Sequence, residues 1–154
     1  WLAKMGIQDY MLYDKVEPEP SIETVNQVIS EYKAKNPSCV IGLGGGSSLD
    51  VAKYSGSEMK LEKILIPTTF GTGAEMTTYC VLKFDGKKKL LREDRFLADR
   101  AIVDAYFMDG TPEQIVKTQF ATHVHRQLRD MTASLATSSR ERCASKPLRF
   151  CTMQ

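Results

Sequence analysis

Short apolar runs, separated by polar and charged segments, give this chain the pattern of an α/β protein. The run 39–41, Cys-Val-Ile, is β-branched and lies between Pro37 and a group of glycines. A run of this length and composition predicts a buried parallel strand rather than an amphipathic helix. Other short runs predict strands at residues 64–66, 101–103 and 10–13, the last preceded by the tail of a helix at residues 2–5.

Apolar residues at helical spacing predict a helix that begins after Ser21. The Ser21 hydroxyl can cap this helix, and Asn36-Pro37 stops it before the strand at 39–41. Residues three and four positions apart share one face of a helix, so the apolar ones should lie in the core. These residues are Ile22, Val25, Val28, Ile29 and Tyr32.

Two further helices are predicted from their N-terminal signals. Ser47, with Asp50 three residues later, forms a capping-box pattern for a helix from about 48 to 54, whose end Gly56 should weaken. Thr111-Pro112-Glu113 combine a cap, a first-turn proline and an early acid, which also predicts a helix.

A β-hairpin is predicted in the second half of the chain. The runs 78–84 and 87–91 flank Asp85-Gly86, a dipeptide suited to a type I′ turn. Strands mixed with helices in this order predict the α/β class.

Glycines follow the strand at 39–41 directly, at positions 42, 44, 45 and 46. Glycine lets the backbone turn sharply and lets a ligand approach its N–H groups closely. A strand, a glycine turn and a helix N-terminus direct unpaired N–H donors and the positive end of a helix dipole at one place, which suits a pyrophosphate. The alternative interpretation is a tight turn that binds no ligand.

A second polar cluster follows the strand at 64–66. Residues 67–75 read P-T-T-F-G-T-G-A-E, so that hydroxyl groups and glycines again gather where a strand ends. Open parallel sheets bind their ligands at this edge. The two clusters together therefore predict one ligand site.

Composition excludes several classes of function. The chain has 154 residues, 42% of them hydrophobic and 26% charged, with a net charge of +2. This balance gives no signal for nucleic-acid or membrane partners, and there is no long apolar run or signal-peptide pattern. The cysteines 39, 80, 143 and 151 have no C-x-x-C spacing, which favours reduced thiols of a cytoplasmic protein over disulfides or a zinc site.

The motifs G-G-G-S-S-x-D-x-A-K and P-T-T-x-G-T-G-A-E resemble the iron-containing alcohol dehydrogenase family, within the dehydroquinate synthase-like superfamily. The resemblance covers residues 5–117 and implies a Rossmann-like parallel sheet with flanking helices and a β-hairpin, an incomplete N-terminal nucleotide-binding domain. It also implies that this chain is a fragment without the family's all-helical second domain. A glycerol or glycerol-phosphate dehydrogenase, or a dehydroquinate synthase-like lyase, is the related alternative, and an inactive truncated fragment is another.

The resemblance also implies roles for individual residues toward NAD or NADP. Backbone groups at Gly44, Gly45, Gly46, Ser47 and Ser48 would hold the pyrophosphate, and Thr68, Thr69 and Thr72 would contact the adenine-nucleotide side. Asp50 is either a helix-cap carboxylate or a group beside the nicotinamide. Lys53 is either solvated or faces the phosphates. Lys89, or Lys88 in the other register, would contact a ribose, unless residues 87–89 are only an exposed charge run.

The implied reaction is hydride transfer between the dinucleotide and a small alcohol or aldehyde. A divalent metal, iron or zinc, would polarise the substrate oxygen in the parent protein. Its ligands would belong to the absent domain, so no catalytic or metal-binding residue is assigned here. The resemblance leaves a homo-oligomeric parent open.

The chain divides into a partial dinucleotide-binding domain, 1–117, and a tail, 118–154, predicted to be non-native and disordered. Basic residues change from mainly lysine to mainly arginine at this boundary, and apolar periodicity is lost. A shifted reading frame from Thr118 permits the family pattern D-A-x-x-x-A-I-E-G-Y, which suggests a frameshift near Lys117. His123 and His125 could pair on a metal, but the expected aspartate is absent.

Overall fold

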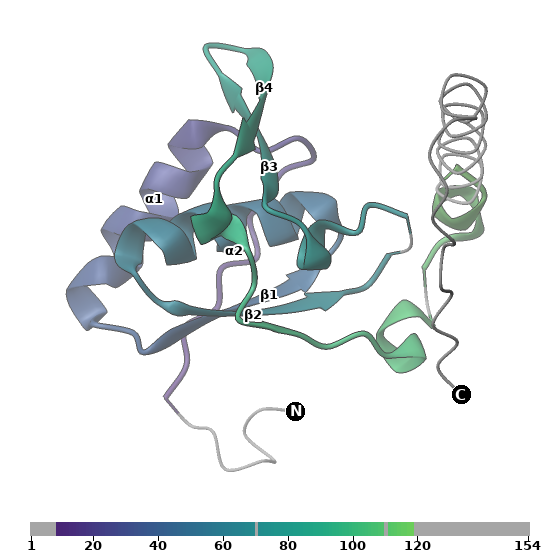
Figure 1. Ribbon diagram of the computed structural model, residues 1–154, viewed down its shortest axis with the longest axis horizontal. Helices are drawn as coiled ribbons and strands as arrows, with labels where there is room; N and C mark the ends of the chain where they lie inside the picture. Colours follow the sequence, from purple (N-terminus) through teal and green to yellow (C-terminus); the bar gives the residue numbers. More distant parts are fainter. Residues whose placement is uncertain (1–8, 70, 110, 119–154) are drawn as a thin grey trace, which may run out of the picture.

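The computed structural model describes residues 9–69, 71–109 and 111–118 (Figure 1). Three strands form a parallel sheet in the order β1-β2-β5, and two form an antiparallel hairpin. The predicted α/β class, with a parallel sheet and a hairpin, is therefore confirmed. The elements are α1 (Ile22–Tyr32), β1 (Cys39–Gly44), α2 (Gly46–Met59), β2 (Glu62–Pro67), β3 (Tyr79–Phe84), β4 (Lys87–Arg92) and β5 (Arg100–Ala101), with short 3-10 turns η2 (Lys33–Lys35), η3 (Ala74–Met76), η4 (Asp94–Phe96) and η5 (Ala105–Met108).

Helix α2 is the central element, with the sheet on one side and α1 and the hairpin on the other (Figure 1). Toward the sheet, Leu49 and Ala52 pack with Leu65 and Ala74. On the opposite side, the second core cluster joins α1, α2, β3 and η4. Its buried members are Val25, Val28, Tyr32, Val51, Cys80, Leu82 and Phe96.

Helix α1 follows the prediction closely. The Ser21 hydroxyl accepts a hydrogen bond from the Thr24 N–H group at 3.3 Å, as an N-cap should. The helix gives way to the turn η2 before Asn36, which has a left-handed φ of 50°. Most of the residues predicted for the core lie there, and Ile22 and Ile29 pack partly buried against it.

One predicted strand, the C-terminal end of α2 and the length of β5 differ from the prediction. Residues 10–13 form no strand, and the Leu12 carbonyl instead accepts a hydrogen bond from the Tyr32 hydroxyl at 3.0 Å. Gly56 does not weaken the end of α2 but lies inside it, since the helix continues to Met59. Of residues 101–103, only Ala101 lies in a strand, although the Ile102 N–H group still donates to the Leu65 carbonyl at 2.9 Å.

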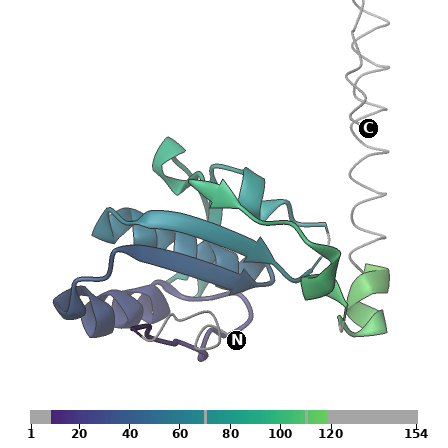
Figure 2. The same cartoon turned by 90° about the horizontal axis from the view of Figure 1, so that it is seen from below.

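Among the described residues, helices cover only one of the two faces of the parallel sheet. Strand β1 pairs with β2 in the register Ile41↔Ile64 and Leu43↔Ile66. Gly42, between them in β1, faces α2, since a Cβ atom added there would lie 2.7 Å from Ala52 Cβ. In Figure 2 the sheet lies in front of α2 and its other face carries no described helix. The prediction that β1 is buried is therefore wrong for this face, where Ile41 is 47% and Leu43 is 54% exposed.

The hairpin turn has the backbone that its sequence predicted. Asp85 and Gly86 both have positive φ, 50° and 72°, as a type I′ turn requires. Residues 113–118 are helical, in agreement with the predicted start at 111–113. No helix in the described ranges is both long enough and apolar enough to span a bilayer. Of the predicted tail, 118–154, the structure describes only Thr118, the last described residue of the helical run 113–118; residues 119–154 and the segment 2–5 fall outside the described residues.

Candidate functional site

The glycine turn, residues 44–48, connects β1 to α2. Gly44 has a φ of 147°, and Gly45 is the extended N-cap of the helix. The helical hydrogen bonds start with the Leu49 N–H group, which donates to the Gly45 carbonyl at 3.1 Å. The amides of residues 46–48 thus come before the helical ladder and lie at the positive end of the helix dipole. This is the arrangement that the sequence predicted for an anion.

The predicted capping box is wrong, because the helix begins earlier than expected. Gly45, not Ser47, is the N-cap, and Ser47 is the second residue of the helix. Its hydroxyl oxygen accepts a hydrogen bond from the Glu19 N–H group at 3.2 Å. Ser47 therefore joins the segment before α1 to the glycine turn.

The threonine segment, residues 67–75, lies against the glycine turn; Phe70 within it is outside the described part. The Thr68 N–H group donates to the Gly44 carbonyl at 3.0 Å. A Cβ atom added at Gly45 would lie 3.4 Å from Thr69 Oγ1, and one added at Gly46 would lie 3.2 Å from Thr72 Cγ2. The two sequence motifs therefore meet at the carboxyl ends of β1 and β2, where the predicted threonines border the predicted glycines.

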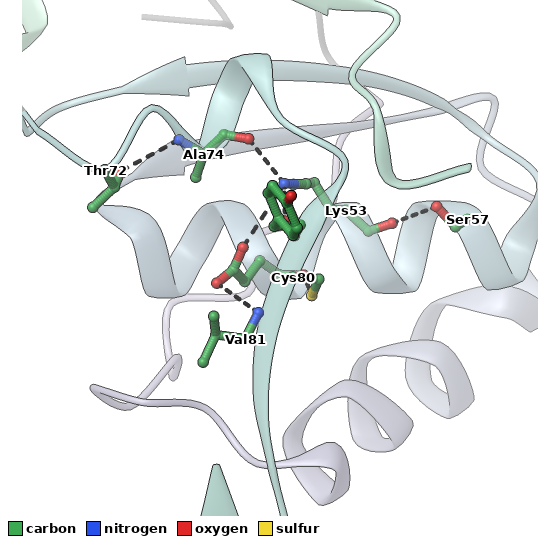
Figure 3. Close-up of polar contacts among 8 residues, drawn as sticks. Lys53, Ser57, Thr72, Ala74, Cys80 and Val81 are labelled. Atoms are coloured by element: carbon green, nitrogen blue, oxygen red, sulfur yellow. Dashed lines mark hydrogen bonds and ion pairs between the residues drawn. The ribbon is translucent and has the colours of Figure 1, made fainter. Parts of the chain in front are cut away.

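Asp50 and Lys53 are both buried, and they make contacts that the sequence did not predict. Asp50 is no cap: its Oδ2 accepts a hydrogen bond from the Val81 N–H group at 3.1 Å, and burial raises the pKa of this carboxyl to about 6. The Lys53 side chain is 0% exposed, so it is not solvated, and it points toward Ala74 (Figure 3). Its ammonium donates to the carbonyls of Ala74, at 2.9 Å, and Tyr79. Burial lowers the pKa of Lys53.

The hairpin lysines separate onto two faces. Lys88 and Lys83 are cross-strand neighbours, and both contact the carboxylate of Glu19, whose pKa they lower, Lys88 more strongly. Lys89 lies on the opposite face, with its ammonium 5.0 Å from the centre of the Phe84 ring. Since Glu19 also contacts Ser47, the structure brings Lys88 rather than Lys89 into the network around the glycine turn.

The contacts of Glu19 and the burial of Lys53 were not predicted from the sequence. Glu19 adopts a φ of 57°, in the left-handed region that few residues other than glycine and asparagine occupy, which only a backbone structure shows. Lys53 stands among Val51, Ala52 and Tyr54, a small-and-apolar surrounding that could have signalled a buried position.

A metal site is not present in the described residues. These contain no group of three His, Cys, Asp or Glu side chains that could hold an ion. His123 and His125 lie outside them. The metal that the resemblance implies therefore does not fit the side chains described.

Comparison with known proteins gives a consistent family relationship. The family model for iron-containing alcohol dehydrogenases matches residues 2–105. Long-chain-alcohol dehydrogenase 1 of Geobacillus thermodenitrificans is 38% identical over 147 residues, covering 74% of this chain and 37% of that protein. The 1-propanol dehydrogenase PduQ of Salmonella typhimurium is 38% identical over 112 residues, covering 68% of this chain and 30% of that protein.

Solved structures agree with the sequence relatives. Sulfoacetaldehyde reductase from Bifidobacterium kashiwanohense, in complex with NAD+, has a TM-score of 0.68 at 27% identity. The match covers 72% of this chain and 36% of that protein. An iron-containing alcohol dehydrogenase from Thermotoga maritima has a TM-score of 0.69 at 27% identity, with 79% of this chain covering 38% of it. The chain thus spans about a third of the length of its relatives.

Proposed function

The chain belongs to the iron-containing alcohol dehydrogenase family, and on that premise we propose that its described part binds the diphosphate of a nicotinamide dinucleotide in an oxidoreductase. The main support for this proposal is that the glycine turn and the threonine segment lie against each other at the carboxyl ends of β1 and β2. The amides of residues 46–48 precede the helical ladder, and at its start Gly45 borders Thr69 and Gly46 borders Thr72, so that an added Cβ atom on either glycine would already be in contact. Such a site accepts an anion with oxygens that approach the backbone closely.

The residues of this chain would bind and orient the cofactor rather than react. The amides of Gly46, Ser47 and Ser48 would donate to the diphosphate oxygens, and the hydroxyls of Thr69 and Thr72 would border the nucleotide. When bound, the dinucleotide supplies or accepts the hydride. NAD is favoured as the first ligand to test because one structural relative was solved with NAD+.

The substrate class proposed for the whole protein is a small alcohol or aldehyde. It is supported by the names of the relatives, which include a long-chain-alcohol dehydrogenase, a 1-propanol dehydrogenase and a sulfoacetaldehyde reductase. The metal would be held outside the residues described. We further propose that residues 118–154 arise from a change of reading frame near Lys117, which the nucleotide sequence of the gene tests directly.

The binding proposal is tested by titrating the 154-residue chain with NADH, and in parallel with NADPH, while recording amide NMR signals. We expect NADH to shift the amide signals of residues 46–48. Gly46→Val should weaken binding by about tenfold or more, because its side chain must displace Thr72 or fill the space over these amides.

Ser57→Ala is the matched control, since Ser57 lies near the other end of α2, where its hydroxyl donates to the Lys53 and Arg95 carbonyls. This variant should bind NADH as the unaltered chain does. A folded sample whose amides 46–48 do not respond to either dinucleotide would contradict the proposal.

A further inference from the structure

Lys53 is an unusual residue for the middle of a packed helix. Its side chain is wholly buried, and the nearest carboxylate oxygen, Oδ1 of Asp50, is 4.0 Å from its ammonium. Burying an ammonium group carries a large desolvation cost, and an apolar side chain of similar length would fill the volume without it. The presence of a charged group here is therefore best explained by the backbone carbonyls to which the Lys53 ammonium donates.

The Lys53 ammonium joins two segments that are separate in the sequence. It donates to the Ala74 carbonyl of the threonine segment at 2.9 Å and to the Tyr79 carbonyl of β3. Figure 3 shows the Lys53 side chain extending from α2 toward Ala74. The glycine turn, the threonine segment and the hairpin are thus connected through one side chain of α2.

Asp50 completes the connection to the hairpin. It lies one helical turn before Lys53 and accepts a hydrogen bond from the Val81 N–H group, while the Cys80 thiol donates to the Asp50 carbonyl at 3.3 Å. On the edge of β3, the Asp50 carboxylate therefore binds the Val81 N–H group and the Lys53 ammonium binds the Tyr79 carbonyl. In a larger sheet, a neighbouring strand would pair with these two backbone groups. These contacts hold β3 against α2 at residues 79–81.

The threonine segment carries this connection to the phosphate site. The Ala74 N–H group donates to Thr72 Oγ1 at 3.4 Å, and Thr72 Cγ2 is the atom that a Cβ at Gly46 would meet at 3.2 Å. Lys53 and Gly46 belong to the same rigid helix. An unbroken series of contacts therefore runs from Lys53 through Ala74 and Thr72 to the first turn of α2.

We propose that Lys53 is a positioning residue for dinucleotide binding, which holds Thr72 over the glycine turn and links this site to the hairpin. The proposal rests on the function proposed above, since it concerns the same diphosphate. Lys53 touches no ligand in this scheme. It acts through the backbone of Ala74 on one side and of Tyr79 on the other.

The main test compares two buried lysines in NADH titrations of the full 154-residue chain. Lys53→Met should weaken NADH binding by about tenfold, because Thr72 is no longer held against Gly46. Lys63→Met is the matched control: Lys63 is also buried, pairs with Asp99 at 3.2 Å and packs against Gly56, far from the glycine turn. It should lower the melting temperature without changing NADH affinity.

Rescue separates positioning from simple loss of stability. Lys53→Arg keeps a cationic donor at this position, so it should bind NADH more tightly than Lys53→Met even where both variants melt at a similarly lowered temperature. Equal NADH affinity for Lys53→Met and the unaltered chain would overturn the proposal, as would equal losses for Lys53→Met and Lys63→Met.

A second measurement needs no variant and remains decisive if Lys53→Met does not fold. In hydrogen exchange on the unaltered chain, NADH should slow exchange at Val81, whose N–H group is bound by Asp50, together with exchange at residues 46–48. Protection of residues 46–48 alone would overturn the link to the hairpin. Absence of any NADH binding would instead refute the proposed function itself.

Discussion

Asp50 shows how burial changes the chemistry of a single carboxyl group. Its pKa rises from an ordinary 3.8 to about 6 because desolvation outweighs both the hydrogen bond from Val81 and the attraction of Lys53. Between these two values the folded protein still holds a proton that the unfolded chain has released. Raising the pH through this window must therefore cost stability.

The consequence is measurable in the variant Asp50→Asn, whose amide oxygen can still accept from Val81. From pH 4 to pH 7, the free energy of unfolding of the unaltered chain should fall by about 2 kcal/mol relative to that of this variant. Urea unfolding across the pH range checks the difference, which cancels contributions of opposite sign from groups such as Glu17, whose pKa is lowered to about 2. Parallel profiles for the two proteins would contradict the assignment.

At the scale of elements, α2 explains which predictions succeeded. Local signals sufficed for α1, where a capping serine and helical spacing agree, and for the hairpin, where Asp85-Gly86 determines the turn. They failed wherever a neighbouring element decides the outcome. Gly56 weakens a helix in isolation, but here it permits close packing of α2 on β1, and Lys53 looks solvent-exposed until the hairpin is placed over it.

Because Gly56 is closely packed, replacing it with alanine should destabilise the protein, which is the opposite of the usual effect of this substitution in a helix. Alanine normally stabilises a helix interior by about 1 kcal/mol relative to glycine. A Cβ atom at Gly56 would lie 2.5 Å from Val40 Cγ1 and 2.8 Å from Lys63 Cγ. Gly56→Ala should therefore lower the free energy of unfolding by about 1 to 3 kcal/mol. Chemical denaturation checks this, and a rise in stability would show that the helix and strand can separate at little cost.

The candidate site, like the fold, was predictable from sequence only in part. The glycines and threonines were recognised because each group follows a strand, and parallel strands bring their carboxyl ends to one edge. The partners of the hairpin could not be read in the same way. Lys88 and Lys89 are adjacent in sequence but lie on opposite faces, and only the register Lys83↔Lys88 shows which one reaches Glu19.

At the scale of the whole molecule, the parallel sheet leaves an apolar face exposed among the described residues. Ile41 and Leu43 of β1 lie on this face, and Ile102 and Val103, following β5, are 46% and 61% exposed. Exposed apolar surface of this kind favours association with other apolar surfaces. The double variant Ile41→Lys with Leu43→Lys should therefore reduce self-association of the chain in sedimentation velocity experiments.

The same double variant should change the thermal melting of the chain only slightly, because its side chains are already half exposed. Leu49→Ala is the comparison, since Leu49 is fully buried between α2 and the sheet. Its loss should cost about 2 to 5 kcal/mol of stability. If the lysine substitutions destabilise the chain as strongly as Leu49→Ala, the face is covered in solution by something beyond the described residues.

The polar edge of β3 has a bearing on aggregation. Strands with open N–H and C=O groups recruit strands from other molecules and so begin fibrils. On β3, the Val81 N–H group is engaged by Asp50, the Tyr79 carbonyl by Lys53 and the Lys83 N–H group by the Pro20 carbonyl. An intruding strand would have to break all three bonds first, so the hairpin is guarded against templating amyloid along this side.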